Sequence, residues 1–438
     1  MKIRKILIII ALSSLCIDAV TPQAKPIYWV HGMGGNSQSL KEFADYFGTN
    51  YNAYMFRAGY RTDLGITGSA QSLSYDINAN SYSENIIIAH SMGGVNSIEL
   101  YRQKNAYSGN YESRYVGGII TLASPINGAF IANNIDNGVL DDFITEAVDK
   151  GSKGARSEPA FVATWLASYV NAEIINRICG TNYSNLRDLL YNLPVKMVKE
   201  EAEKTVQSAA TKNSLKTNST EIDNIQNSGF IRPSIAIYGV EDSPAFIRLV
   251  SSRKDANAIL LIELIYQTCQ QRYSFHNNMY YACLATLQFA QAAVHSNLAS
   301  KWKTSRDYWN GQFQKSTDVL IGAYRTVTQT VEYWDYECNC SEPLQKILSC
   351  DWPCPPEYQV PVLRHRTVTT IIEEESDGLL VTSTQKALPG CLRTIRTDHI
   401  NHEEMKTHST VKAELEKIFL GTTYTDRDRE FFILDEKN

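Results

Sequence analysis

The chain has 438 residues, of which 43% are hydrophobic and 20% are charged. This composition is typical of a globular protein with a large buried core, and it excludes collagen-like, disordered and multi-span membrane chains. The formal net charge of −5 and the lack of a long basic run give no electrostatic support for binding nucleic acid, so we predict no nucleic-acid partner.

The beginning of the chain predicts an export signal. A basic cluster at residues 2–5 precedes an apolar run at residues 6–12, and small residues follow near positions 19 and 24. This order is typical of a secretory signal peptide, and the apolar run is too short to span a bilayer. We therefore predict a signal peptide at residues 1–24, a secreted or periplasmic mature chain, and no transmembrane segment in that chain.

The cysteines favour disulfide bonds. Cys16 lies in the predicted signal, which leaves Cys179, Cys269, Cys283, Cys338, Cys340, Cys350, Cys354 and Cys391. An even number in an exported chain is typical of a disulfide-bonded protein. The cluster at residues 338–354 is an alternative zinc site, but it lacks the paired C-x-x-C spacing of common zinc sites. We predict disulfides and no metal site.

Strands and helices alternate directly after the signal. Four short apolar runs predict strands, the last two being continuous β-branched runs of the kind buried in a parallel sheet: Pro26–Val30, Ala53–Arg57, Asn85–Ala89 and Val116–Leu122. Helices are expected from Ser37 onward and between His90 and Tyr101. This order predicts right-handed βαβ units, and hence an α/β fold.

Two long stretches interrupt the alternation. Residues 133–230 have a helical composition, and residues 244–366 have aromatic and leucine residues at helical spacing from Asn257 to Trp334, followed by the cysteine cluster. The alternation of strands and helices that is typical of the core occupies the rest of the chain after the signal. We predict an α/β core at residues 25–132, 231–243 and 367–438, with strands at Ser234–Tyr238 and Leu392–Thr397 and a helix at Val411–Phe419, and two largely helical insertions that form a cap or lid.

The strongest chemical motif is Ala89-His90-Ser91-Met92-Gly93-Gly94, between a buried strand and a helix. A nucleophilic serine on a strained strand-to-helix turn needs small residues two positions to either side, because the turn folds those positions against each other. Ala89 and Gly93 meet this need. Ser91 is therefore predicted to be a nucleophile, with the Met92 N–H directed at a developing oxyanion.

A second motif, His31-Gly32-Met33-Gly34, follows the first strand of the core. A glycine-rich loop at that place can present the Met33 backbone N–H as the other oxyanion donor. His31 itself is expected to be a structural histidine of the loop and not a base.

With these motifs the sequence resembles secreted α/β-hydrolases of the bacterial triacylglycerol lipase and esterase type. The matching stretches are YWVHGMGG, NIIIAHSMGGV, TLASPINGA, SDGLLVTSTQ and INHEEM. They are spread over most of the mature chain but make up a modest part of it, because neither insertion has a match. The resemblance implies a Ser-acid-His triad in that chain order. It also places the TLASPINGA turn beside the mouth of the site.

The acid and the histidine follow from this resemblance. Asp377, in Ser376-Asp377-Gly378, is similar to the turn that bears the lipase triad aspartate, while Asp242, directly after a strand, has the position of the acid in simpler members of the fold. We favour Asp377 and keep Asp242 as the alternative. His402 matches the lipase pattern N-H-x-x-(M/V) and is preferred over His399 and His408.

The expected activity is hydrolysis of carboxylic esters of lipids or other acyl compounds through an acyl-enzyme, with no metal or organic cofactor. The expected partner is a small-molecule or lipid ester, with contact to a lipid interface. Acyl transfer or amide cleavage by the same triad is one alternative. The other is a non-catalytic binding scaffold at the cell envelope.

Overall fold

The computed structural model describes residues 24–80, 82–104, 112–158, 208–241, 256–338, 359–422 and 431–437. Its centre is a six-stranded sheet in the order β2-β1-β3-β4-β5-β8, in which every neighbouring pair is parallel. The strands are β1 (Lys25–Val30), β2 (Ala53–Arg57), β3 (Asn85–His90), β4 (Val116–Leu122), β5 (Ser234–Val240) and β8 (Cys391–Asp398).

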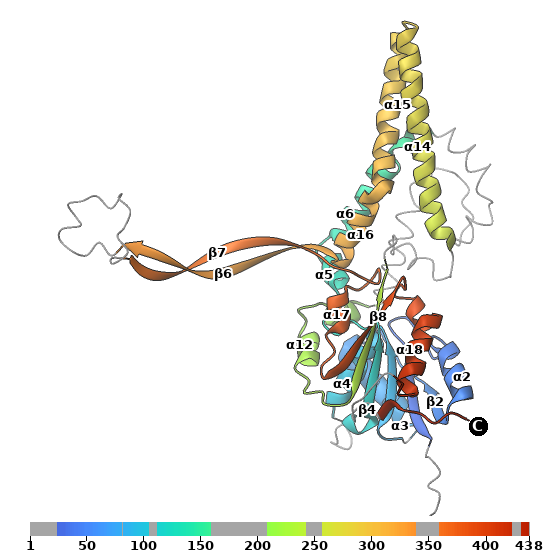
Figure 1. The fold of residues 1–438 in the computed structure, drawn as a ribbon, viewed down its shortest axis with the longest axis vertical. Coiled ribbons are helices and arrows are strands. Elements are labelled where there is room, and N and C mark those ends of the chain that lie inside the picture. The colour runs from blue at the N-terminus through green and yellow to red at the C-terminus, as the bar shows by residue number, and fades with distance from the viewer. Residues whose placement is uncertain are drawn as a thin grey trace, which may run out of the picture. The chain divides into compact units, whose positions relative to one another are not determined.

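Helices cover both faces of this sheet (Figure 1). On one face, α2 (Lys41–Asn50) and α18 (Ser409–Phe419) pack with alternate strand residues into a core that contains Trp29, Phe47 and Phe419. On the other face, the Tyr28 hydroxyl donates to the carbonyl of Ile77 in α3 (Gly65–Asn78). The four inner strands β1, β3, β4 and β5 are buried on both sides, which explains their nearly continuous apolar sequences, whereas the edge strands β2 and β8 are partly exposed.

The remaining helices of the core are short or lie next to the strand ends. They are α4 (Met92–Arg102), η1 (Glu112–Tyr115), α17 (Thr382–Lys386) and η5 (Glu404–Lys406). The serine turn between β3 and α4, the strand order and the two-sided cover of helices are those of an α/β-hydrolase core. The predicted fold class is confirmed, and each predicted strand of the core lies within two residues of its expected limits.

The described part of the first insertion is helical, as expected. It consists of α5 (Phe130–Asp136), α6 (Val139–Glu146), η2 (Ala147–Gly151), α7 (Lys153–Ser157), α11 (Ala209–Ser214) and α12 (Thr220–Gln226). Ser208 and Ser219 cap α11 and α12 by accepting hydrogen bonds from backbone N–H groups at Thr211 and Ile222.

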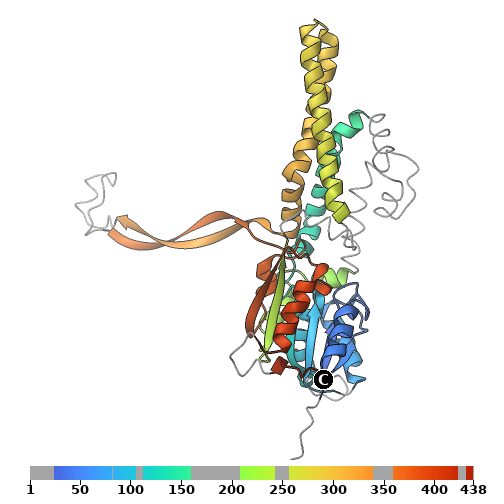
Figure 2. The ribbon, with the colours of Figure 1, turned by 45° about the vertical axis from the view of Figure 1, so that its right-hand side comes forward.

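The second insertion begins with helices. The long helices α14 (Ala256–Ala285) and α15 (Phe289–Asp307) lie side by side and are joined by a short turn (Figure 2). They are followed by η3 (Tyr308–Gln312) and α16 (Phe313–Ile321). None of the described helices is long and apolar enough to cross a membrane.

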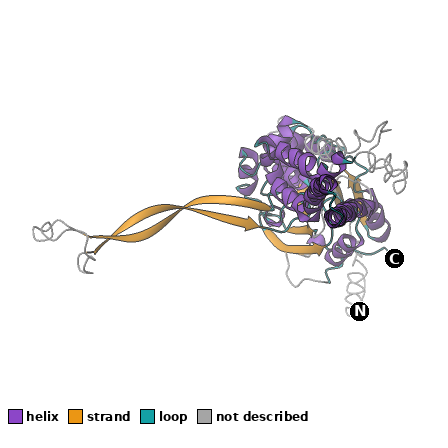
Figure 3. Ribbon diagram, turned by 90° about the horizontal axis from the view of Figure 1, so that it is seen from above, coloured by secondary structure: helices purple, strands orange, loops and turns teal. Residues whose placement is uncertain are grey.

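The prediction of helix as far as Trp334 is wrong. The chain instead forms a two-stranded antiparallel ribbon from β6 (Tyr324–Cys338) and β7 (Gln359–Glu373), whose strands twist about each other (Figure 3). Alternating Thr, Val and Tyr explain the strands, because β-branched and aromatic residues fit an extended backbone. Residues 367–373, assigned to the C-terminal core, belong to this ribbon. Residues 323–374 form a compact unit of their own.

Three cysteines whose side chains the structure describes are free thiols: Cys269, Cys283 and Cys391. The predicted disulfides therefore do not include these three. Cys269 and Cys283 are buried on α14, and burial raises the pKa of the Cys269 thiol to about 12. The other cysteine side chains of the mature chain lie outside the described residues, and disulfides among them remain a prediction.

Candidate active site

Ser91 occupies a strained turn between β3 and α4. Its backbone has φ 53° and ψ −132°, in the half of conformational space that side chains other than glycine rarely adopt. Such a conformation costs on the order of 1–3 kcal/mol and persists only where the surroundings enforce it. Here the Ser91 N–H donates to the Leu122 carbonyl and its carbonyl accepts from Gly94. The hydroxyl makes no capping bond to α4, so it is available to other partners.

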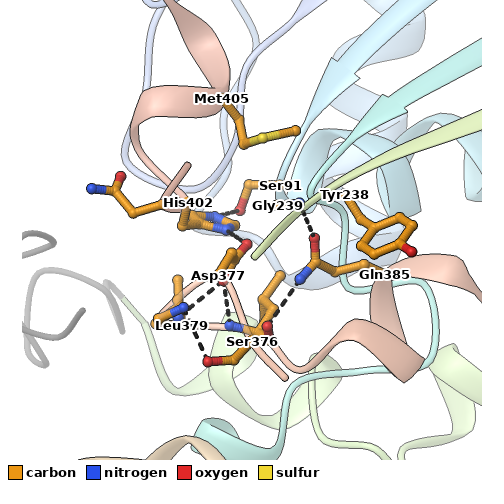
Figure 4. Close-up of polar contacts among 12 residues, drawn as sticks. Ser91, Tyr238, Gly239, Ser376, Asp377, Leu379, Gln385, His402 and Met405 are labelled. Carbon is orange, nitrogen blue, oxygen red and sulfur yellow. Dashed lines mark hydrogen bonds and ion pairs between the residues drawn. The ribbon is translucent and has the colours of Figure 1, made fainter. Parts of the chain in front are cut away.

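The hydroxyl of Ser91 meets the imidazole of His402. The Nε2 atom of His402 lies 2.9 Å from the Ser91 Oγ, and its Nδ1 lies 2.8 Å from Oδ2 of Asp377 (Figure 4). A carboxylate only accepts hydrogen bonds, so Nδ1 carries the proton and Nε2 accepts from the serine. The structure thus brings together the three residues that the sequence analysis selected, in the geometry that a Ser-His-Asp triad requires.

Asp377 is fully buried in a tight turn. Its Oδ1 accepts hydrogen bonds from the N–H groups of Leu379 and Leu380, at 3.0 and 2.7 Å. These bonds leave Oδ2 for the histidine and compensate the loss of water around the carboxylate. Next to it, the Ser376 carbonyl accepts from the N–H of Glu241, which ties this turn to the end of β5. Asp377 is therefore attached at the strand end where simpler members of the fold have their acid.

Two backbone contacts hold the His402 loop in place. The N–H of His402 donates to the Asp377 carbonyl at 3.0 Å. The carbonyl of His402 is 2.9 Å from Nε2 of His90, which must donate because a carbonyl cannot. Burial lowers the pKa of His90 well below its usual value, so this ring is neutral. The sequence analysis missed this role, because a histidine before the serine has no chemical signature of its own.

The glycine-rich loop after β1 lies directly against the serine. A Cβ atom on Gly32 would come within 2.5 Å of the Ser91 Cβ, and one on Gly93 within 2.7 Å of the His31 carbonyl. Only glycine permits these approaches. They place Met33 and Met92, the two predicted oxyanion donors, on the segments that flank Ser91, with Met92 as the first residue of α4.

His31 has the structural position that the sequence analysis expected. Its ring stacks on Tyr60 with centroids 4.6 Å apart, and the Tyr60 hydroxyl donates to the His31 carbonyl at 2.7 Å. Asn96 of α4 donates in turn to the Tyr60 hydroxyl. Burial lowers the pKa of His31. A neutral histidine facing an aromatic ring supports the loop and is not placed between the serine and the acid.

Comparison with known proteins gives distant similarities only. No protein-family model and no curated protein matches the sequence. The chain is similar in structure to Est816, described as an N-acyl homoserine lactone degrading enzyme, with 15% identity and a TM-score of 0.27 over 49% of this chain and 74% of that one. It is also similar to lipase 1 from Pelosinus fermentans, with 14% identity and a TM-score of 0.28 over 51% and 70% of the two chains.

A third similar structure is the phospholipase PlaB from Legionella pneumophila, with 11% identity and a TM-score of 0.29. That match covers 51% of this chain and 41% of the phospholipase, less than half of its length. Because these identities and TM-scores are low, the function proposed below depends on the geometry of this chain alone.

The remaining candidate residues lie elsewhere. His399 is exposed after β8, and His408 is the N-cap of α18, where its ring accepts from the Thr410 N–H. Neither is joined to Ser91 by a described hydrogen bond. Asp242, the alternative acid, lies outside the described residues. Among the residues that are described, no group of three or more His, Cys, Asp or Glu side chains is arranged to hold a metal ion.

Proposed function

We propose that the protein is a serine hydrolase that cleaves carboxylic esters, with lipid or acyl esters as its substrate class. The observation that carries this proposal is the continuous chain of contacts from the Ser91 Oγ through His402 to Asp377, at 2.9 and 2.8 Å. A serine that only stabilised the turn would not need a buried histidine and carboxylate behind it.

The proposed reaction has two halves. His402 accepts the Ser91 proton as the serine oxygen attacks the ester carbonyl, and the buried Asp377 carboxylate stabilises the resulting imidazolium. The N–H groups of Met33 and Met92 stabilise the oxyanion. The alcohol leaves with the proton from His402. Water, deprotonated by the same histidine, then hydrolyses the acyl-enzyme and returns Ser91 to its starting state.

The test is hydrolysis of p-nitrophenyl esters of increasing chain length by wild type and Ser91→Ala. We expect activity in the wild type and its loss in the variant at an unchanged thermal midpoint. A preference for long chains would support lipids as the substrate, and a preference for short chains a general esterase. Equal activity in both proteins would exclude Ser91 as nucleophile, and products that appear only with an added alcohol or amide would favour acyl transfer or amide cleavage.

We also propose that the enzyme is exported, because its first residues have the order of a signal peptide. N-terminal sequencing of protein recovered from the periplasm or medium of a bacterial host is expected to begin near residue 25. Recovery from the cytoplasm alone, with residue 1 retained, would contradict export.

A further inference from the structure

We infer that the turn between α14 and α15 docks on the surface of a lipid bilayer or lipid aggregate. The docking segment, named the tip here, is Tyr281–Val294. This inference deepens the proposed function. It rests on that function only for the conclusion that the docked enzyme acts on the lipid it touches, since docking itself needs no catalysis.

The tip belongs to an unusually long uncharged segment. No Asp, Glu, Lys or Arg occurs between Arg272 and Lys301, although 20% of the whole chain is charged. A solvent-exposed helical pair of this length would be expected to carry several charges, because charged residues form much of a soluble surface. Their absence indicates an environment other than water at this end of the two helices.

Apolar side chains at the tip are exposed. Leu287 is 74% exposed, Phe289 64%, Tyr281 60% and Val294 57%. Leu287 lies in the connection between α14 and α15, and Phe289 is the first residue of α15. The other two lie within about one and a half helical turns of this connection, and the two helices run side by side (Figure 2). Single exposed apolar residues are common, but a group of them at one end of an element is typical of an interaction site.

Lipid is favoured over protein as the occupant because of the charges. Protein docking sites commonly have charged residues at their rim that select the partner and its orientation. The tip has none, since its exposed polar residues, Thr286, Gln288 and Gln291, are all uncharged. The first charges after it, Lys301 and Lys303 on α15, are both basic, as is needed near anionic headgroups. From Tyr281 to Ala285, the last residue of α14, the helix rises about 6 Å at ~1.5 Å per residue, which agrees with an interfacial insertion of ~5–10 Å.

A partly buried polar cluster holds the two helices together below the tip. The carboxylate of Glu158, which follows α7, accepts from Trp302 Nε1 of α15 at 2.6 Å and from Arg272 of α14 at 2.5 Å. The same carboxylate is 2.8 Å from Nε2 of the buried His276. This cluster neutralises Arg272 and fixes the helical pair, so the tip is presented without reordering the helices on docking.

The experiment is flotation with vesicles of phosphatidylcholine and phosphatidylglycerol, using the mature chain without residues 1–24. Leu287→Asn with Phe289→Asn is expected to lower the vesicle partition coefficient at least tenfold. The matched control is Ile231→Asn, an isoleucine that is 82% exposed in the segment before β5, and it is expected to bind as wild type does. All three proteins should hydrolyse a soluble short ester equally, which verifies their folding.

A second variant leaves the tip unchanged. Lys301→Glu with Lys303→Glu should weaken binding to anionic vesicles and not to purely neutral ones. Docking on lipid is overturned if wild type does not float with vesicles, if the tip variant floats equally well, or if wild type is a dimer that the tip variant dissociates. Ser91→Ala is expected to float as wild type does, so loss of the ester activity alone would contradict the proposed function and leave docking intact.

Discussion

At the scale of single residues, the site combines a strained serine with groups that are fully fixed behind it. Ser91 holds a backbone conformation that costs free energy, while Asp377 is buried with both carboxylate oxygens hydrogen-bonded. Preorganised groups of this kind need little rearrangement as charge develops in the transition state. We therefore expect small chemical changes at the acid to have large kinetic effects.

Asp377→Asn tests the assignment of the acid. An amide in place of the carboxylate keeps the shape of the turn but favours the wrong tautomer of His402, so kcat is expected to fall by about 10³–10⁴-fold. Asp242→Asn is the control and should change kcat less than about threefold, the margin we set for no effect. Steady-state kinetics on a soluble ester would measure both, and the reverse order would assign the acid to Asp242.

His90 gives the stability a defined pH dependence. Its pKa in the folded protein lies well below the ~6.5 of an unfolded chain, because the ring is buried. Below pH ~6.5 the unfolded chain therefore binds a proton that the folded one does not, and the free energy of unfolding falls by up to about 1.4 kcal/mol per pH unit. His90→Gln keeps a donor for the His402 carbonyl and removes this titration. Urea unfolding between pH 7 and 5 should show a shallower decline for the variant, and identical slopes would contradict the prediction.

At the scale of elements, the core was predictable and the ribbon was not. The inner strands of the core are buried on both faces, so continuous apolar runs such as Ile86–Ala89 mark them in the sequence. The strands β6 and β7 are exposed along much of their length and mix Thr, Arg and Glu with aromatic residues. Their alternation of Thr with Val and Tyr is not apolar enough to distinguish them in the sequence, and their aromatic spacing imitates a helix. Pairing between strands, which sequence spacing does not reveal, decided the outcome.

The candidate active site was likewise predictable in part: its three central residues could be predicted from the sequence, and the contacts that support them could not. Ser91 lies in a motif whose small residues are demanded by a tight turn, and Asp377 and His402 were selected because their segments resemble lipase motifs. The supporting contacts of His90 and Tyr60 depend on which loops meet in three dimensions, and a single sequence does not show this.

The loop after β1 and the serine turn act as one element because they touch at Gly32. Gly32→Ala would place a methyl group 2.5 Å from the Ser91 Cβ, so we expect kcat/KM to fall more than about tenfold as the serine is displaced. Gly59→Ala is the matched control, since its new methyl group would meet only an Asp76 oxygen at 3.8 Å. Kinetics and thermal unfolding of both variants measure the effect, and equal behaviour of the two would show that Gly32 does not position Ser91.

At the scale of the whole molecule, the residues of the candidate active site and the ribbon belong to different compact units. Ser91, Asp377 and His402 all belong to the larger compact unit, and residues 323–374 form the smaller one. The two ends of the smaller unit are close together, since the N–H of Glu374 donates to the Ala323 carbonyl at 2.8 Å. The ribbon is therefore an insertion whose two ends lie close together.

Replacing residues 324–373 by a short Gly-Ser linker tests this separation. We expect the shortened chain to fold and to hydrolyse soluble esters within about threefold of the wild-type kcat/KM, because a short flexible closure costs little. The thermal midpoint and steady-state kinetics would be compared with those of the full chain. A shortened protein that folds but has lost ester hydrolysis would contradict the separation.

The central claim is that Ser91 is a nucleophile activated by His402. It is tested most directly by reaction with a fluorophosphonate, followed by peptide mass spectrometry, in wild type, His402→Ala and Ser91→Ala. We expect stoichiometric labelling of Ser91 in wild type, labelling slowed by at least about 10³-fold in His402→Ala, and none at this peptide in Ser91→Ala. A folded wild-type protein with an unlabelled Ser91, or with label at another serine, would contradict it.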